Sequence, residues 1–201
     1  MNEEAKKKNK ITLIMLGLFF ASPLVLSWFV FNYTDYLEMR GTSNRGELIQ
    51  PPRQLGDLAL IDPFDEERKD SLFNKWSLVY IAYSCDETCM ESVYLIRQIH
   101  ARMDKHSLRV QRVLLLTTES NEALKGKLSD YAGQQLINNE TINVEEVVNK
   151  FKLTDSDKPL SANRIYIVDP VGNLMMNYKP GTNPGDIYKD LKKLLRGSRI
   201  G

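Results

Sequence analysis

Residues that build disulfide frameworks and metal clusters are scarce in this sequence. Its 201 residues include two cysteines, Cys85 and Cys89, and two histidines, His100 and His106. Two cysteines cannot form the several bridges of a disulfide-rich exported domain, so the pair is either one local bridge or a working dithiol. We also find no zinc-ligand cluster, phosphate-binding glycine loop or Ser/His/Asp arrangement. The cysteine pair is therefore the one candidate reaction centre in the sequence.

An excess of charge of one sign is also missing. The chain carries 27 basic and 26 acidic residues, which gives a formal net charge of +1. Proteins that bind nucleic acids usually present a strongly basic face, which such a balance does not indicate. We therefore expect no nucleic-acid partner.

Charged residues are absent from position 11 to position 34, and residues 11–31 form a continuous apolar run. A helix of ~20 apolar residues crosses the ~30 Å hydrocarbon core of a bilayer. A cleaved signal peptide has a shorter apolar region followed by a small-residue cleavage site, which this run lacks, and a core helix of a soluble protein would be amphipathic. The sequence predicts an uncleaved transmembrane helix at residues 11–33.

The charges before this helix predict its orientation. Four lysines and two glutamates occur in residues 1–10, and lysine-rich flanks stay on the cytoplasmic side. We expect residues 1–10 to be a cytoplasmic tail and the chain to cross the inner (plasma) membrane once. The C-terminal domain would then be exported, into the periplasm of a Gram-negative cell. Residues 34–56 mix charge, glycine and proline with little periodicity and are predicted to be a tether.

The remainder, residues 57–201, begins with strand patterns. A short strand is predicted at residues 58–61. The nearly continuous apolar run at residues 76–83 is typical of a central strand that is covered on both faces. A further strand is predicted at residues 110–116, after an intervening helix. Strand, helix and strand in succession form a βαβ unit, whose strands are parallel.

The second half of this domain predicts helices followed by a hairpin. Helical stretches are expected at residues 121–131 and 144–151. Strands at residues 164–168 and 174–178 flank the turn sequence Asp-Pro-Val-Gly and should pair antiparallel. A last helix is predicted from the capping Asn183 to Arg196. This order of elements predicts an α/β thioredoxin-like fold, a central mixed sheet flanked by helices, attached to one N-terminal transmembrane helix.

The cysteines lie between the first strand of the βαβ unit and its helix. Thr88 and Glu91 have the spacing of a capping box, so the helix should begin at about Cys89 and leave Cys85 in the preceding loop. The N-terminus of a helix favours a thiolate. The two carboxylates that follow Cys85 disfavour a thiolate but would stabilise a bound cation.

These features together resemble the Sco/SenC family. The matching stretches are KWSLVYIAYSCDETC (Lys75–Cys89) and RIYIVDPVGNL (Arg164–Leu174), and the likeness covers roughly residues 55–195. Members resemble thioredoxins in fold, and they use C-x-x-x-C to bind copper and exchange thiols while cytochrome c oxidase is assembled. The resemblance implies that Cys85 and Cys89 are the catalytic pair and the ligands of copper. It also implies that the partner is a cytochrome c oxidase subunit or another copper or thiol protein.

Departures from the family pattern narrow the expected metal site. The family has proline after each cysteine, where this chain has Asp86 and Met90, and a histidine ligand just before the hairpin, where this chain has Leu-Ser-Ala-Asn at 160–163. Neither His100 nor His106 replaces that ligand, because even the nearer one lies roughly 16 Å along the helix from the second cysteine. We therefore expect Cu(I) on two thiolates, to which Met90 could add a thioether.

Three functions stay open from the sequence. The first, which we favour, is an assembly factor for a haem–copper oxidase that handles Cu(I), exchanges thiols, or does both. The second is a general periplasmic thiol–disulfide oxidoreductase without metal, in which Cys85 attacks and Cys89 resolves. The third is a binding-only assembly factor with a structural Cys85–Cys89 bridge. A metallochaperone is not an enzyme, whereas a thiol–disulfide oxidoreductase is. Whether this protein is an enzyme therefore depends on which of the three functions it has.

Overall fold

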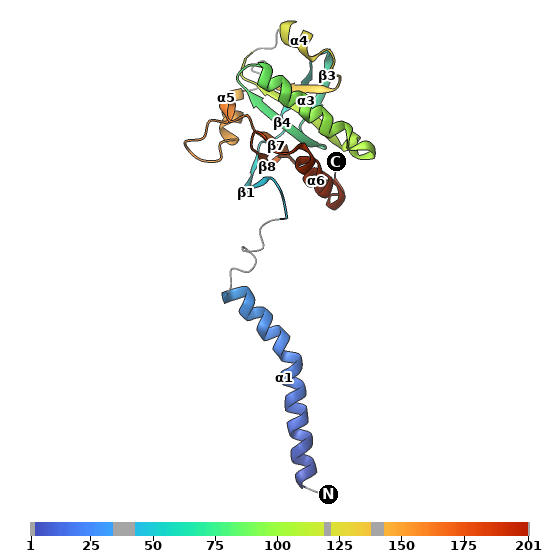
Figure 1. Ribbon diagram of the computed structural model, residues 1–201, viewed down its shortest axis with the longest axis vertical. Coiled ribbons are helices and arrows are strands. Elements are labelled where there is room, and N and C mark those ends of the chain that lie inside the picture. Colours follow the sequence, from blue (N-terminus) through green and yellow to red (C-terminus); the bar gives the residue numbers. More distant parts are fainter. Residues whose placement is uncertain (1–2, 34–42, 119–121, 138–142, 201) are drawn as a thin grey trace. The chain divides into compact units, whose positions relative to one another are not determined.

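The computed structural model describes residues 3–33, 43–118, 122–137 and 143–200 (Figure 1). The chain divides into two compact units, residues 1–43 and residues 44–201.

The N-terminal unit contains the helix α1 (Glu3–Tyr33), with Pro23 inside it. Its segment Lys6–Tyr33 has 28 residues and is apolar enough to cross a membrane. At ~1.5 Å per residue the segment is ~42 Å long, more than the ~30 Å of a hydrocarbon core. Its large apolar side chains are exposed, as shown by Phe19 at 73% and Leu24 at 74%. These properties are consistent with the membrane anchor predicted at residues 11–33.

The described part of residues 44–201 is built on one mixed sheet of eight strands, in the order β1-β8-β7-β4-β5-β6-β2-β3. The strands are β1 (Glu47–Gln54), β2 (Ala59–Asp62), β3 (Asp65–Ser71), β4 (Trp76–Ala82), β5 (Val110–Leu116), β6 (Gln134–Ile137), β7 (Ile165–Val168) and β8 (Asn173–Tyr178). The central strand β4 is parallel to β5 and antiparallel to β7, and all of its residues are buried. The predicted βαβ unit and the antiparallel β7–β8 hairpin are therefore confirmed.

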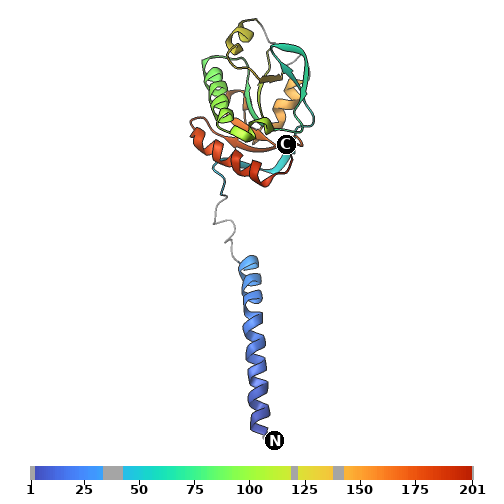
Figure 2. The same ribbon diagram turned by 90° about the vertical axis from the view of Figure 1, so that its right-hand side faces the viewer.

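Helices cover both faces of the sheet, which is why β4 is buried throughout (Figure 2). The helical elements are α3 (Glu87–Ala101), η1 (Asp104–Arg109), α4 (Glu122–Leu128), α5 (Val144–Lys150), η2 (Pro159–Ser161) and α6 (Pro184–Gly197). Side chains of α3, α4 and α6 share one hydrophobic cluster with the sheet, and side chains of α5 share the other. The thioredoxin-like α/β fold predicted from the sequence is confirmed.

Three strands, β1, β3 and β6, were not expected from the sequence. The predicted tether at residues 34–56 is wrong for the stretch that forms β1, whereas residues 34–42 lie outside the described residues. β1 is an edge strand, and its two prolines fall where its register with β8 shifts, between Leu48 and Arg53. Proline is tolerated at such places because it has no N–H to donate. The charged β3 is the opposite edge strand, a position that suits charged side chains.

Candidate functional site

The two cysteines lie where the chain passes from β4 to α3. A disulfide joins Cys85 to Cys89, with their Cα atoms 5.0 Å apart. Cys85, in the loop, is half-buried, whereas Cys89, in the first turn of α3, has an exposed fraction of only 1%. A reactant approaching from solvent therefore meets Cys85 before Cys89.

The helix α3 begins at Glu87, two residues earlier than predicted, and its cap is Asp86. The Oδ1 atom of Asp86 accepts a hydrogen bond from the backbone N–H of Cys89, with a distance of 2.9 Å. The predicted capping box of Thr88 and Glu91 is therefore wrong, since an aspartate located one residue after Cys85 satisfies the helix terminus first. The carboxylate of Asp86 lies at the N-terminus of α3, where the positive end of the helix dipole partly offsets its negative charge.

A third sulfur lies beside the disulfide. The Sδ atom of Met90 is 3.6 Å from the Sγ atom of Cys85. Met90 is half-buried in the first turns of α3. The structure thus brings the Met90 thioether, a donor expected from the sequence, into contact with the first cysteine.

A cation that the sequence did not predict lies at the site. Lys127, in α4, donates a hydrogen bond from Nζ to the backbone oxygen of Cys85 over 3.0 Å. The same lysine and Cys85 line a small pocket of about 150 Å³. Because 42 residues separate them in the chain, no local pattern could have revealed this contact.

The loop before β7 lies against β4 near the site. The Tyr80 hydroxyl donates to the Asn163 side-chain oxygen, 2.9 Å away. Burial raises the pKa of Tyr80, and the charge of Asp86 raises it further, so the hydroxyl stays protonated and can donate. Asn163 has a φ of +48°, in the left-handed region that asparagine tolerates. The Sco/SenC pattern has a histidine in this loop. Here the loop instead contains Asn163, whose side-chain amide is hydrogen-bonded to Tyr80.

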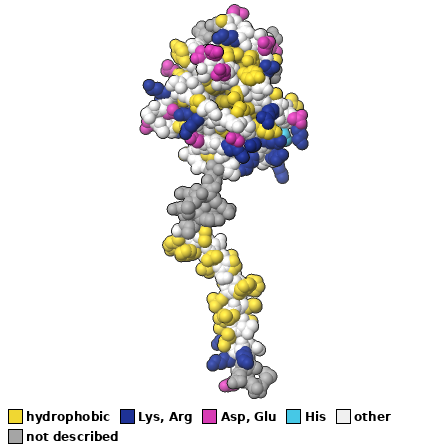
Figure 3. All heavy atoms as spheres, viewed as in Figure 1, with side chains coloured by type: hydrophobic (Ala, Val, Ile, Leu, Met, Phe, Trp, Pro, Cys, Tyr) yellow, Lys and Arg dark blue, Asp and Glu magenta, His cyan; other side chains and the backbone are white. Residues whose placement is uncertain are grey.

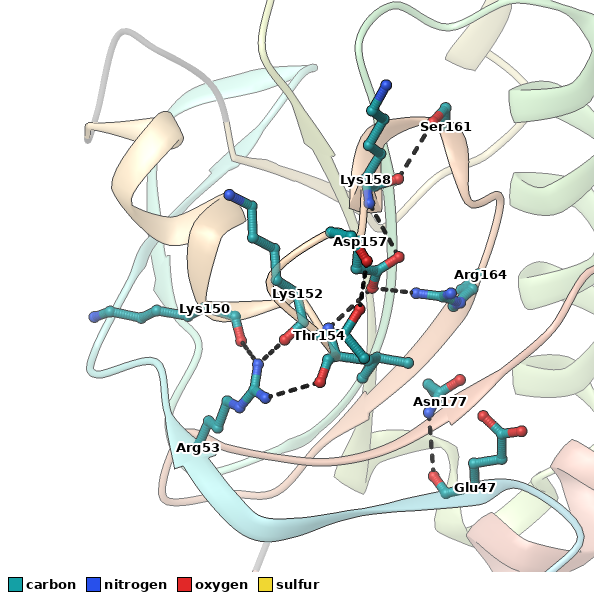
Figure 4. A network of polar contacts seen from close by, with 12 residues as sticks. Glu47, Arg53, Lys150, Lys152, Thr154, Asp157, Lys158, Ser161, Arg164 and Asn177 are labelled. Atoms are coloured by element: carbon teal, nitrogen blue, oxygen red, sulfur yellow. Dashed lines mark hydrogen bonds and ion pairs between the residues drawn. The ribbon is translucent and has the colours of Figure 1, made fainter.

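A pocket of about 890 Å³ opens between the end of β4, α5 and the loop 152–161. Figure 4 shows how this loop is held: Arg53, from β1, donates to the backbone oxygens of Lys150 and Lys152. A 2.6 Å ion pair joins Arg164 to Asp157. Burial raises the pKa of Asp157, but the hydrogen bond and charge of Arg164, together with hydrogen bonds from the backbone N–H groups of Leu153 and Lys158, leave the pKa lowered. Arg53 and Arg164, which do not line the pocket, therefore hold its wall in place.

The histidines lie away from the cysteines, as predicted. The Nε2 atom of His100 is 3.1 Å from the backbone oxygen of Ser107 and 3.0 Å from that of Val110, so it is engaged by the chain that follows α3. His106 lies in η1. Within the described residues, no group of three His, Cys, Asp or Glu is placed to hold a metal ion. The structure brings three sulfur atoms together at the site, those of Cys85, Cys89 and Met90.

Charge is unevenly distributed along α3. Asp86, Glu87 and Glu91 lie at its N-terminal end, beside the disulfide. Basic side chains gather near the other end and over α6 (Figure 3). There, Arg102 and Lys192 lie over the ring of Tyr188, 4.8 Å and 5.1 Å from its centroid. The immediate surroundings of the disulfide therefore favour a cationic ligand or partner over an anionic one.

Comparisons with known proteins agree with this architecture. Residues 76–198 match the family described as "Transmembrane-like, thioredoxin-like, C-terminal domain". The sequence matches no curated protein.

Three solved structures illustrate the likeness in fold. Copper-bound yeast Sco1 is 16% identical, with a TM-score of 0.58 over 74% of this chain and 96% of its own. BsSco, described as a member of the Sco family of cytochrome c oxidase assembly proteins, is 14% identical, with a TM-score of 0.53 over 74% and 96%. A thiol:disulfide interchange protein from Bacteroides sp. is 16% identical, with a TM-score of 0.52 over 74% and 91%. At these identities the likeness is one of fold.

Proposed function

Since the chain belongs to the family of transmembrane-like, thioredoxin-like C-terminal domains, we propose that its exported domain works through reversible opening of the Cys85–Cys89 disulfide and that the reduced pair carries Cu(I) to a haem–copper oxidase under assembly. The observation that carries this proposal is the unequal exposure of two bonded cysteines at the start of α3. A bridge that served only to staple the fold would not need one sulfur near the surface.

Opening the bridge is ordinary thiol–disulfide exchange. A reductant thiolate attacks the Sγ atom of Cys85, forms a mixed disulfide with it and releases the thiolate of Cys89. A second reductant thiolate then takes over the mixed disulfide, and the pair is left as two thiols. In the reverse direction, the thiolate of Cys85 attacks a client disulfide, and Cys89 then displaces the reduced client. The accessible cysteine suits attack and the buried one suits resolution.

The donor set supports Cu(I) as the cargo. Thiolate and thioether sulfurs are soft ligands that select Cu(I), whereas Cu(II) prefers nitrogen and oxygen donors in tetragonal geometry. The thioether of Met90 contacts the Sγ atom of Cys85. The Nε2 atom of His100 instead lies within hydrogen-bond distance of the backbone oxygens of Ser107 and Val110. Acidic side chains beside the site add attraction for a cation. The copper found in yeast Sco1 is in keeping with this assignment.

The proposed partner rests on the expected location of the protein. We infer that α1 holds the domain at the membrane, with the lysines of residues 1–10 on the cytoplasmic side, and that a cytochrome c oxidase subunit or another copper or thiol protein receives the cargo. A haem–copper oxidase is itself a membrane protein. Anchoring the carrier in the same bilayer raises its effective concentration at the client.

The decisive experiment is a Cu(I) titration of the reduced full-length protein in detergent, against a chelator of known affinity. We expect one equivalent to bind in the wild type and in His106→Gln, and to be lost in Cys85→Ser and in Cys89→Ser. Circular dichroism of each variant checks that the fold is retained. Failure of the wild type to bind copper would remove the cargo from the proposal.

A metal-free thiol–disulfide oxidoreductase is the second candidate, and the Lys127 contact favours it. A cation beside Cys85 stabilises the attacking thiolate, which exchange requires. A redox titration of the pair tests this step for both candidates. A midpoint well above about −300 mV indicates a working dithiol, whereas a lower value indicates a structural bridge. Thiol–disulfide exchange with a midpoint well above about −300 mV, without copper binding, would favour the metal-free oxidoreductase.

A further inference from the structure

The contact between Met90 and Cys85 follows from the way α3 starts. With Asp86 as the cap, Cys85 is the residue before the cap and Met90 is the fourth residue of the helix. Side chains on a helix lean toward its N-terminus, and apolar residues at these two positions commonly pack together as a hydrophobic staple. The fold therefore directs the Met90 side chain back over Cys85, where their sulfurs are 3.6 Å apart.

A staple alone does not require sulfur. Leucine at this position would make the same apolar contact, and methionine differs from it mainly in its polarisable thioether and flexibility. The thioether is also a soft metal donor. The position of Met90 therefore places a potential ligand beside a cysteine pair that becomes a pair of soft donors when it is reduced.

The spacing of the sulfurs suits a trigonal site. With a metal–sulfur bond of about 2.3 Å, three ligands in a plane around one metal are about 4.0 Å from each other. The observed distance between Met90 Sδ and Cys85 Sγ differs from this value by a few tenths of an ångström. Reduction releases the Cys85–Cys89 bond, and Cα atoms 5.0 Å apart allow their sulfurs to separate to the same distance through side-chain rotation. Little movement of the backbone is needed.

Two other side chains near the site already accept hydrogen bonds. The Asn163 side-chain oxygen accepts from Tyr80, and Asp86 caps α3. The remaining described methionines of the domain lie elsewhere: Met103 is buried just before η1, and Met175 and Met176 are in β8. Among the described residues, Met90 is the thioether that contacts the pair.

We propose that Met90 is the third ligand of the Cu(I) ion carried by Cys85 and Cys89, so that the site is an all-sulfur trigonal one. The assignment rests on the proposed copper-handling function and adds to it the coordination number and the identity of the third donor. Such a site favours Cu(I) over Cu(II), because all three donors are soft. Oxidation of the ion would therefore weaken binding.

Met90→Leu tests this assignment, and Met175→Leu in β8 is the matched control. Both exchange one flexible apolar side chain for another of similar volume, which cores tolerate well, and leucine preserves the staple. Cu(I) competition with the reduced full-length protein should show affinity at least tenfold lower in Met90→Leu and unchanged in Met175→Leu.

X-ray absorption of protein labelled with selenomethionine gives a second readout. The assignment predicts a selenium atom in the first shell of copper, lost in Met90→Leu and kept in Met175→Leu. Wild-type copper binding without selenium in that shell, with Met90→Leu within twofold of wild-type affinity, would overturn the Met90 assignment and leave the copper proposal standing. No copper binding by the wild type would overturn both.

Discussion

Lys127 and Cys85 are 42 residues apart in the chain, yet the lysine ammonium donates to the cysteine backbone oxygen across 3.0 Å. The contact joins α4 to the loop that carries the reactive sulfur. It adds positive charge to a site whose neighbours along the chain, Asp86 and Glu87, are both acidic.

Removing this cation should slow the reaction of Cys85. In the reduced protein, Lys127→Met is expected to lower the rate of alkylation of Cys85 at pH 7 by about twofold to fivefold, the range that an exposed charge interaction of up to ~1 kcal/mol allows. Iodoacetamide modification followed by mass spectrometry measures the rate. Lys125→Met, on the same helix, is the control, and equal rates in wild type and Lys127→Met would contradict the prediction.

Unfolding free energies of variants can show whether Asp86 or Thr88 caps α3. Asp86→Ala should lower the free energy of unfolding by about 1 kcal/mol, because the N–H of Cys89 loses its acceptor. Asp86→Asn should keep most of the stability, since asparagine is an equally good cap. Urea unfolding of the oxidised protein, followed by near-ultraviolet circular dichroism, measures these changes. A larger loss in Thr88→Ala than in Asp86→Ala would restore the capping box inferred from sequence.

His100 predicts a pH dependence of stability. Burial lowers the pKa of His100, and the positive charge of Arg112 lowers it further. The folded protein therefore binds a proton less readily than the unfolded chain, whose histidine has a pKa of about 6.5. The stabilisation is complete above that pH and is lost as the pH falls through the folded pKa.

Urea unfolding at pH 8 and pH 5.5 checks this dependence. We expect His100→Gln to lose less stability than the wild type over this interval, and Leu108→Gln, an exposed neighbouring substitution without a titratable group, to match the wild type. A His100→Gln variant that loses more stability than the wild type between pH 8 and pH 5.5 would contradict the sign of the shift.

The orientation of the anchor is directly measurable. With an N-terminal epitope tag on the chain, protease added outside intact spheroplasts should digest residues 44–201 and leave the tag protected, because the lysines of residues 1–10 favour the cytoplasmic side. The mass of the mature protein should include α1, since the prediction is an uncleaved helix. If the protease digests residues 44–201 only after the cells are lysed, the domain lies on the cytoplasmic side and the predicted orientation is wrong.

The elements that the sequence predicted well are those whose own residues set their structure. The apolar runs of β4 and β5, and the Asp-Pro-Val-Gly turn between β7 and β8, carry strong local signals. The strands that were missed depend on neighbours. β1 contains a Pro-Pro pair and β3 is almost entirely charged, so each is a strand chiefly because an adjacent edge is available for pairing.

The sequence by itself determined the apolar N-terminal helix, the order of the sheet's central elements and the position of two cysteines at a strand-to-helix junction. These depend on hydrophobic runs and spacing, which act over a few neighbouring residues. Only the tertiary structure decided that Cys89 is fully buried while Cys85 is half-buried, that Lys127 reaches Cys85 from α4 and that Asp86 rather than Thr88 caps α3. Exposure and long-range contacts arise from packing between distant segments, and the choice of cap depends on where the chain leaves the sheet.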